Sequence, residues 1–160
     1  MKMLWRLIAV LTLIGGLEMS GCNNSSGSLS FKEPKEPQAW AILSDQPVYA
    51  VVTETDWTKY YSTRPPQADF KEKFYIVATL DPKPNPGYRI SITSINQTGS
   101  SLQVRLKLDE PDPKVAYAQV IVRPTAVAEA RIDALKQRGK LNFEFLDQKG
   151  STLARMDIEI

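Results

Sequence analysis

The fold is decided by an alternating stretch, Leu102-Gln103-Val104-Arg105-Leu106-Lys107-Leu108-Asp109, in which apolar and polar side chains follow one another. Alternation with a period of two predicts a β-strand that buries one face and exposes the other. Residues 88–93 (YRISIT) alternate in the same way, and residues 96–100 (NQTGS) between the two segments favour a turn. We therefore expect a β-hairpin, with the sequon Asn96-Gln97-Thr98 in its turn.

Four further segments have the residue patterns of β-strands. Residues 74–80 (FYIVATL) and 115–122 (VAYAQVIV) are apolar on both faces, which predicts two central strands covered on both sides. Residues 141–145 and 154–160 alternate on either side of Gln148-Lys149-Gly150 and predict a second hairpin. The fold class that these segments indicate is all-β: an antiparallel β-sandwich or a partly closed barrel.

Helix is expected only as one or two short pieces. Residues 55–61 can form one or two turns, and residues 133–138 can form another that stops at Gly139. Residues 126–131 (AVAEAR) suit either a helix, because alanine favours it, or a strand, because they follow Pro124. The sequence leaves both readings of this segment open.

The N-terminus has the features of an export signal. Lys2 and Arg6 precede an apolar run, residues 7–17, which is shorter than the roughly 20 residues that span a bilayer. Met19-Ser20-Gly21-Cys22 follows and resembles the lipobox of bacterial lipoproteins. We expect residues 1–21 to be a lipoprotein signal peptide and Cys22 to carry a lipid with fatty acids such as palmitate.

An ordinary signal peptide with Cys22 near its cut site by chance is the alternative. The lipoprotein interpretation places the chain in the bacterial cell envelope, on the outer face of a membrane, in the periplasm or at the cell surface. Small polar residues after Cys22 predict a flexible tether over residues 22–37, and the remaining length suits a single β-rich domain over residues 38–160.

Composition argues against several kinds of chemistry. The chain has no histidine and one cysteine, so it lacks the usual partners for Ser-His or Cys-His catalysis and the usual zinc or copper ligands. Asp109, Glu110 and Asp112 lack the spacing of a calcium loop and read as a solvated turn. We expect no enzymatic activity, no catalytic residue, no metal and no cofactor.

Charge argues against a nucleic-acid partner. Without Lys2, Arg6 and Glu18, the 20 basic and 18 acidic side chains become 18 and 17, a net charge of +1. The basic residues are scattered among acidic ones, with no dense stripe to neutralise a phosphate backbone. Aromatic side chains in the first half of the domain are either core or a surface for a sugar or a protein: Trp40, Tyr49, Trp57, Tyr60, Tyr61 and Tyr75.

From Asp69 onward the chain resembles the C-terminal domain of PrcB-type proteins, the lipoprotein subunits of protease complexes. The similar pieces appear in the family's order: Asp69-Phe70, residues 75–78 (YIVA), residues 87–92 (GYRISI), residues 102–108, Pro111-Asp112-Pro113 and residues 118–124 (AQVIVRP). The resemblance implies a small β-domain that binds and supports an exported protease complex without catalysing a reaction itself.

The departure from the family lies at Asn85-Pro86-Gly87-Tyr88, where the family has Thr-Gly-Gly-Tyr. Pro86 fixes φ near −65° and restricts the path of this loop. The segment is also similar to the Asn-Pro-x-x-Gly-Tyr loop of chagasin-type protease inhibitors, which are immunoglobulin-like β-proteins. Asn85, Pro86, Gly87 and Tyr88 are therefore the candidate partner-binding loop. A protease inhibitor, a glycan-binding module, and a plain turn with Tyr88 in the core remain the alternatives.

Overall fold

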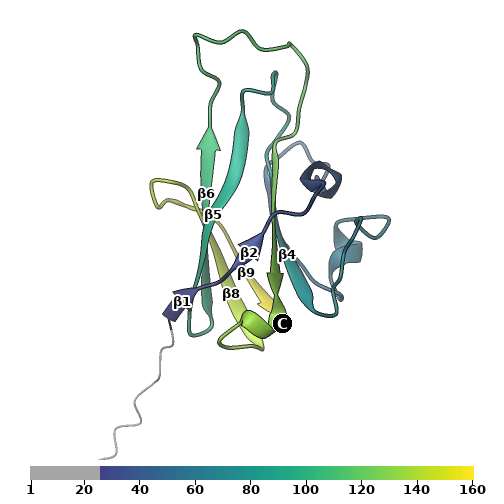
Figure 1. Cartoon of the computed structure of the whole chain (residues 1–160), viewed down its shortest axis with the longest axis vertical. Helices are drawn as coiled ribbons and strands as arrows, with labels where there is room; N and C mark the ends of the chain where they lie inside the picture. Colours follow the sequence, from purple (N-terminus) through teal and green to yellow (C-terminus); the bar gives the residue numbers. More distant parts are fainter. Residues whose placement is uncertain (1–25) are drawn as a thin grey trace, which may run out of the picture.

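A computed structural model describes residues 26–160, which form two β-sheets packed face to face (Figure 1). The first sheet has the order β1-β5-β6-β8-β9: Ser26–Ser28, Arg89–Thr98, Ser101–Asp109, Lys140–Leu146 and Thr152–Glu159. The second has the order β2-β7-β4-β3: Phe31–Lys32, Thr125–Arg131, Lys73–Thr79 and Val48–Val52. Neither sheet closes on itself within these residues, so the all-β prediction is confirmed in its sandwich form.

The first predicted hairpin is β5 with β6, in antiparallel register from Arg89–Asp109 to Thr98–Ser101. Its turn contains only Gly99 and Ser100, and Gly99 has a φ of 57°, which glycine adopts without strain. The prediction of a turn at Asn96-Gln97-Thr98 is therefore wrong. The strand continues through this tripeptide because the side chain of Gln97 is buried and hydrogen-bonded.

The C-terminal hairpin is also confirmed, as β8 with β9. However, β8 runs parallel to β6, so the first sheet is not purely antiparallel as expected. The reason lies in the strand between them: β7 belongs to the second sheet, and the chain returns from it to the first sheet in the direction of β6. The alternation of apolar and polar residues within a strand does not predict whether that strand runs parallel or antiparallel to its neighbour.

Strand β4 is the central strand predicted from residues 74–80. It lies between β3 and β7, and its residues from Phe74 to Thr79 are buried. Its neighbour β7 shows that residues 126–131 form a strand and not a helix. Ala126, Ala128 and Ala130 point into the space between the sheets, whereas Val127 points to the opposite face.

The other predicted central strand, residues 115–122, is wrong. These residues form part of a long loop, residues 110–124, whose only bridge to the rest of the β-structure in the described chain joins Val122 to Lys83. Pro111, Pro113 and Pro124 bracket the segment and remove backbone donors at both ends. Because no neighbouring strand among the described residues pairs with it, this apolar segment stays at the surface.

Two apolar clusters hold the sandwich together. One fills the space between the sheets, and the other covers the outer face of the second sheet. In the outer cluster, Trp40 stacks on Tyr75 with 4.2 Å between ring centroids, and the Tyr61 hydroxyl donates to the Trp40 carbonyl at 2.8 Å. The interpretation of the aromatic residues as core is confirmed for Trp40 and Tyr75, while Tyr49, Trp57, Tyr60 and Tyr61 are partly buried.

Two short parts of the segment predicted as a tether form strands, residues 26–28 and 31–32. Residues 26–28 pair with β5, residues 31 and 32 pair with β7, and the Leu29 side chain is 4% exposed in the core. Leu29 and Phe31 supply the apolar area that fixes this crossing between the sheets. The domain therefore begins before residue 38. The predicted signal peptide, Cys22 and residues 23–25 lie outside the described residues.

Helical structure among the described residues is limited to three single 3-10 turns: η1 (Pro37–Trp40), η2 (Trp57–Lys59) and η3 (Ile132–Ala134). η2 lies within the predicted residues 55–61. η3 ends early, because Leu135 is extended and buried, so residues 135–138 are not the helix that the sequence predicts. In the part of the chain that the structure describes, no helix has the length and apolarity needed to cross a bilayer.

Candidate protein-binding site

The long loop of residues 110–124 carries exposed apolar side chains at one end of the sandwich. Val115 is 50% exposed, Val120 51% and Ile121 80%. Figure 1 places this loop at the top of the molecule, at the end opposite to β1. Exposed apolar residues grouped in one segment are typical of interaction surfaces.

A second segment adds to the same end. Leu43 is 81% exposed, and it precedes Ser44, whose carbonyl oxygen accepts a hydrogen bond from the guanidinium of Arg123. This contact brings the chain around Leu43 next to the end of the long loop. We call the four exposed side chains, Leu43, Val115, Val120 and Ile121, the distal apolar surface.

Contacts within and around the long loop fix its path. The backbone groups of Lys83 and Val122 exchange two hydrogen bonds, of 2.8 and 2.9 Å. The Asp112 amide donates to the Tyr117 hydroxyl at 3.2 Å, and the Lys114 amide donates to the Asp112 carboxylate at 2.9 Å. The distal apolar surface thus belongs to a loop with a defined shape.

The predicted site residue Gly87 packs against this loop, and Asn85 holds it in place. The Gly87 amide donates to the Asn85 side-chain oxygen at 3.0 Å, which forms a tight turn. A β-carbon on Gly87 would lie 2.5 Å from Pro111 Cβ and 2.9 Å from Tyr117 Cζ, closer than any real carbon contact. Glycine is needed here because no side chain fits, and the loop of residues 85–88 is braced on one side.

Pro86 and Tyr88 face a different direction. Pro86 is exposed, and Tyr88 is partly buried with Lys83 Nζ 5.6 Å from its ring centroid. Lys83 also pairs with Asp81 at 2.8 Å. The expected turn leading into a strand is present, but Tyr88 is outside both core clusters, so the alternative that places Tyr88 in the core is wrong. The Lys83 side chain, and not the second sheet, lies over the Tyr88 ring.

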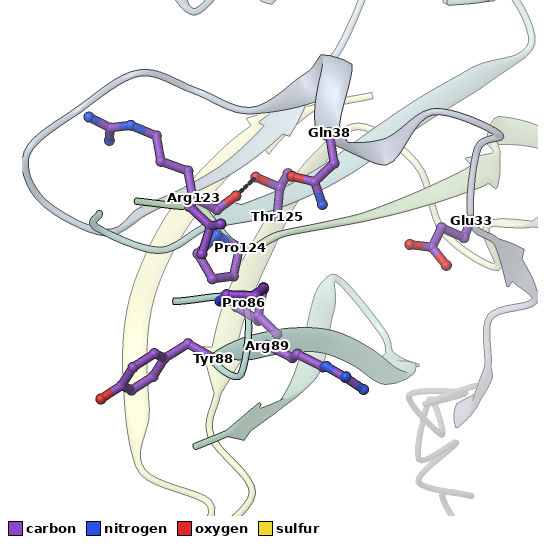
Figure 2. Close-up of a pocket in the computed structure, with 10 residues that line it drawn as sticks. Glu33, Gln38, Pro86, Tyr88, Arg89, Arg123, Pro124 and Thr125 are labelled. Carbon is purple, nitrogen blue, oxygen red and sulfur yellow. Dashed lines mark hydrogen bonds between the residues drawn. The ribbon is translucent and has the colours of Figure 1, made fainter. Parts of the chain in front are cut away.

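A groove of about 540 Å³ lies beside these two residues. Pro86, Tyr88 and Arg89 form one wall, and Val122 to Thr125 form the other (Figure 2). Glu33, which follows β2, and Gln38, in η1, line it as well. The structure therefore brings Pro86 and Tyr88 together at a groove, and it places Asn85 and Gly87 behind them.

Two acidic residues at this end have partners nearby. Asp109 pairs with Lys107 at 2.8 Å, and the Asp112 carboxylate accepts from the backbone of its own turn. Among residues 26–160, no group of three or more histidine, cysteine or acidic side chains is close enough to hold a metal ion.

Two open sheets packed face to face, with two loops gathered at one end, define a β-sandwich domain. Residues 74–130 of this domain match the family model described as PrcB C-terminal, so this part of the chain is similar to that family. The matched segment runs from β4 into β7 and contains both loops of the candidate site. The resemblance expected from the sequence is thus confirmed. No curated protein and no solved structure matches the chain significantly.

Sequence reasoning missed the distal apolar surface. It assigned residues 115–122 to a buried strand, although the prolines on both sides were a signal for a loop. Leu43 gave no signal of exposure, since it ends the apolar run Trp40-Ala41-Ile42-Leu43, which does not alternate. The groove was also missed, because the residues that line it come from three segments that are far apart in the sequence.

Proposed function

We propose that this protein is a non-enzymatic lipoprotein of the bacterial cell envelope, whose β-sandwich binds and supports a protein partner, with an exported protease complex as the candidate partner. The match to PrcB C-terminal domains supports the association with a protease complex. The absence of histidine from the sequence and its single cysteine support a role without catalysis.

The observation that carries the partner-binding role is the distal apolar surface. Exposure of 80% for Ile121 and 81% for Leu43 leaves apolar area in water that a protein partner would bury. A lipid on Cys22 would hold the β1 end close to the membrane, and the long loop that carries Val115, Val120 and Ile121 lies at the opposite end (Figure 1). This position favours a protein over the bilayer as its partner.

Two alternative functions receive less support. A chagasin-like inhibitor needs a loop that can enter a protease cleft, whereas Gly87 is buried against Pro111 and Tyr117. A glycan-binding module needs exposed aromatic faces, whereas Trp40 and Tyr75 are buried against each other. The role of supporting a protease complex needs only an exposed binding surface, which the distal apolar surface provides.

Site-specific crosslinking in the envelope tests this proposal. A photoreactive amino acid in place of Ile121 should give an adduct with one protein, which mass spectrometry then identifies. The control position is Arg138, which is exposed and lies two residues after Lys136, whose ammonium group donates to the Ser26 carbonyl in β1. Equal adducts from both positions, or none from Ile121, would contradict the partner-binding role.

The membrane anchor has a separate test. Growth with labelled palmitate should label the wild-type chain and not a Cys22→Ala variant, and only the variant should leave the membrane fraction on washing. A Cys22→Ala chain that incorporates the label, or that stays in the membrane, would contradict lipid attachment at Cys22.

A further inference from the structure

The outer edge of β5 is only partly covered. β1 pairs with residues 96–98, and the Leu29 amide donates to the Ile95 carbonyl at 2.8 Å. The chain then leaves for the second sheet. Among residues 26–160, no strand pairs with residues 89–94 on this side. Six residues of β5, roughly 20 Å of strand, therefore offer backbone donors and acceptors at an open edge.

This open edge has less protection against strand pairing than the other edge of the sheet: its register with β6 shifts between Ile92 and Ser94, and its one charged side chain is Arg89. Natural edge strands often carry charged side chains that discourage a further strand. The other edge of the same sheet, β9, has them: Arg155 pairs with Glu144 at 2.5 Å, and Asp157 pairs with Lys140 at 3.0 Å. In residues 90–94 (ISITS) there is no charge.

The open edge borders the groove. Arg89 and Ile90 line the groove from β5, and Thr125 lines it from the start of β7. β2 covers β7 only at Glu129 and Ala130, so the start of β7 also lacks a partner on this side. The groove thus lies between two sheet edges, and its 540 Å³ can hold part of an extended chain.

We propose that this groove binds an extended segment of the protein partner, which adds to β5 as a strand beside residues 89–94. The inference rests on the proposed function. The chain's own β1 already binds the same edge in this way, and the added segment would continue that row of strands. Backbone hydrogen bonds would supply affinity, and Arg89 and Glu33 at the groove would select the side chains.

A second copy of this chain does not suit the groove. Residues 29–40 cross from the edge of β5 to the edge of β7, and Glu33 and Gln38 stand at the rim (Figure 2). A whole sheet edge from another molecule would meet this crossing segment, whereas a single extended chain can pass beside it.

Hydrogen exchange with a selected peptide tests the inference. The full chain, purified from membranes in detergent, is screened against a displayed library of random ten-residue peptides, and the best binder is synthesised. We expect this peptide to slow amide exchange in residues 89–94 at least several-fold and to leave β9 unchanged. Protection in β9, or the absence of any binder, would overturn the inference.

A pair of tryptophan variants gives the matched control. Gln38→Trp places a bulky ring in the groove, and Glu36→Trp places the same ring on an exposed position outside it. We expect Gln38→Trp to weaken peptide binding at least tenfold and Glu36→Trp to leave it unchanged. Equal affinities, or a concentration-dependent dimer that protects residues 89–94 without peptide, would contradict strand addition by a partner.

The two proposals fail in different ways. If the Ile121 crosslink to the partner forms in the wild type and is equally strong in Gln38→Trp, the partner-binding function stands and the groove inference is wrong. If the crosslink is missing in the wild type, the proposed function itself fails. Loss of the crosslink in Gln38→Trp but not in Glu36→Trp supports both.

Discussion

Gly87 faces the ring of Tyr117 so closely that a β-carbon on Gly87 would lie 2.9 Å from Tyr117 Cζ. The same carbon would lie 2.5 Å from Cβ of Pro111, whose ring has little freedom to move. This relationship joins the loop of residues 85–88 to the long loop that carries the distal apolar surface.

Replacing Gly87 by alanine should therefore push the two loops apart. We expect Gly87→Ala to lower the free energy of unfolding by about 1–3 kcal/mol through overpacking, and to weaken the Ile121 crosslink. Chemical denaturation measures the first effect. Pro86→Ala at the neighbouring exposed position is the control and should change stability by less than about 0.5 kcal/mol. Equal stabilities of the two variants would contradict the tight contact.

Leu29 tests whether the N-terminal segment is part of the domain. Its side chain is buried in the core between the sheets, so Leu29→Ala should cost about 2–5 kcal/mol of unfolding free energy. Leu43→Ala removes the same atoms from an exposed position and should cost less than about 0.5 kcal/mol. If both variants melt like the wild type, residues 26–32 do not contribute to the fold as described.

Gln97 fixes the end of β5 to the start of β8. Its amide nitrogen donates to the carbonyl oxygens of Gly99 and Gln137, and its oxygen accepts from the Lys136 amide at 2.9 Å. Gln97→Ala would leave these backbone groups without partners, at a cost of about 2 kcal/mol or more. Gln103→Ala is the exposed control, and urea denaturation of both variants gives the difference. A loss as small as that of the control would contradict this role.

Alkaline pH should destabilise the fold through three buried or partly buried tyrosines. Burial raises the pKa of Tyr61, of Tyr75 and of Tyr49, the last with a further contribution from the Asp81 carboxylate. The folded chain therefore holds these phenolic protons more tightly than the unfolded chain. The stability is fully present below about pH 10, the ordinary tyrosine pKa, and is lost as the pH rises above it.

Tyr61→Phe isolates one of these groups. The variant should lose about 1 kcal/mol at neutral pH, because the hydrogen bond to the Trp40 carbonyl disappears. Above about pH 10 its stability should decline less steeply than that of the wild type, since one titrating group is gone. Denaturation curves on both sides of this pH measure the slopes, and parallel slopes would contradict the assignment to Tyr61.

Much of the fold follows from local patterns. Alternation predicts β5, β6, β8 and β9, and an apolar run predicts β4, because burial on one or both faces determines which positions of a strand are apolar. The same rule failed at residues 115–122, where apolar residues are exposed at the surface of a loop. Residues 26–32 were misread because small polar residues can also pair at a sheet edge, which composition does not reveal.

The candidate site was harder to predict than the fold. The motif at residues 85–88 led to the correct end of the molecule, and Pro86 and Tyr88 do line a groove. The opposite wall comes from residues 122–125, and the rim comes from Glu33 and Gln38. This arrangement depends on how the chain crosses from β1 in one sheet to β2 in the other. The pattern of apolar and polar residues does not predict that crossing.

The parallel pairing of β6 with β8 has a consequence for the speed of folding. Every residue of β6 in this pair meets a residue 41 positions later, whereas the two hairpins join neighbours across short turns. Closing the longer loop costs entropy before its contacts stabilise the chain. We expect the hairpins to form early and their parallel docking to limit refolding to about milliseconds to seconds, which stopped-flow fluorescence of buried Trp40 would follow. During that interval the unpaired edge of β6 would be open to intermolecular pairing, so a newly exported chain would be most prone to aggregate before β8 docks.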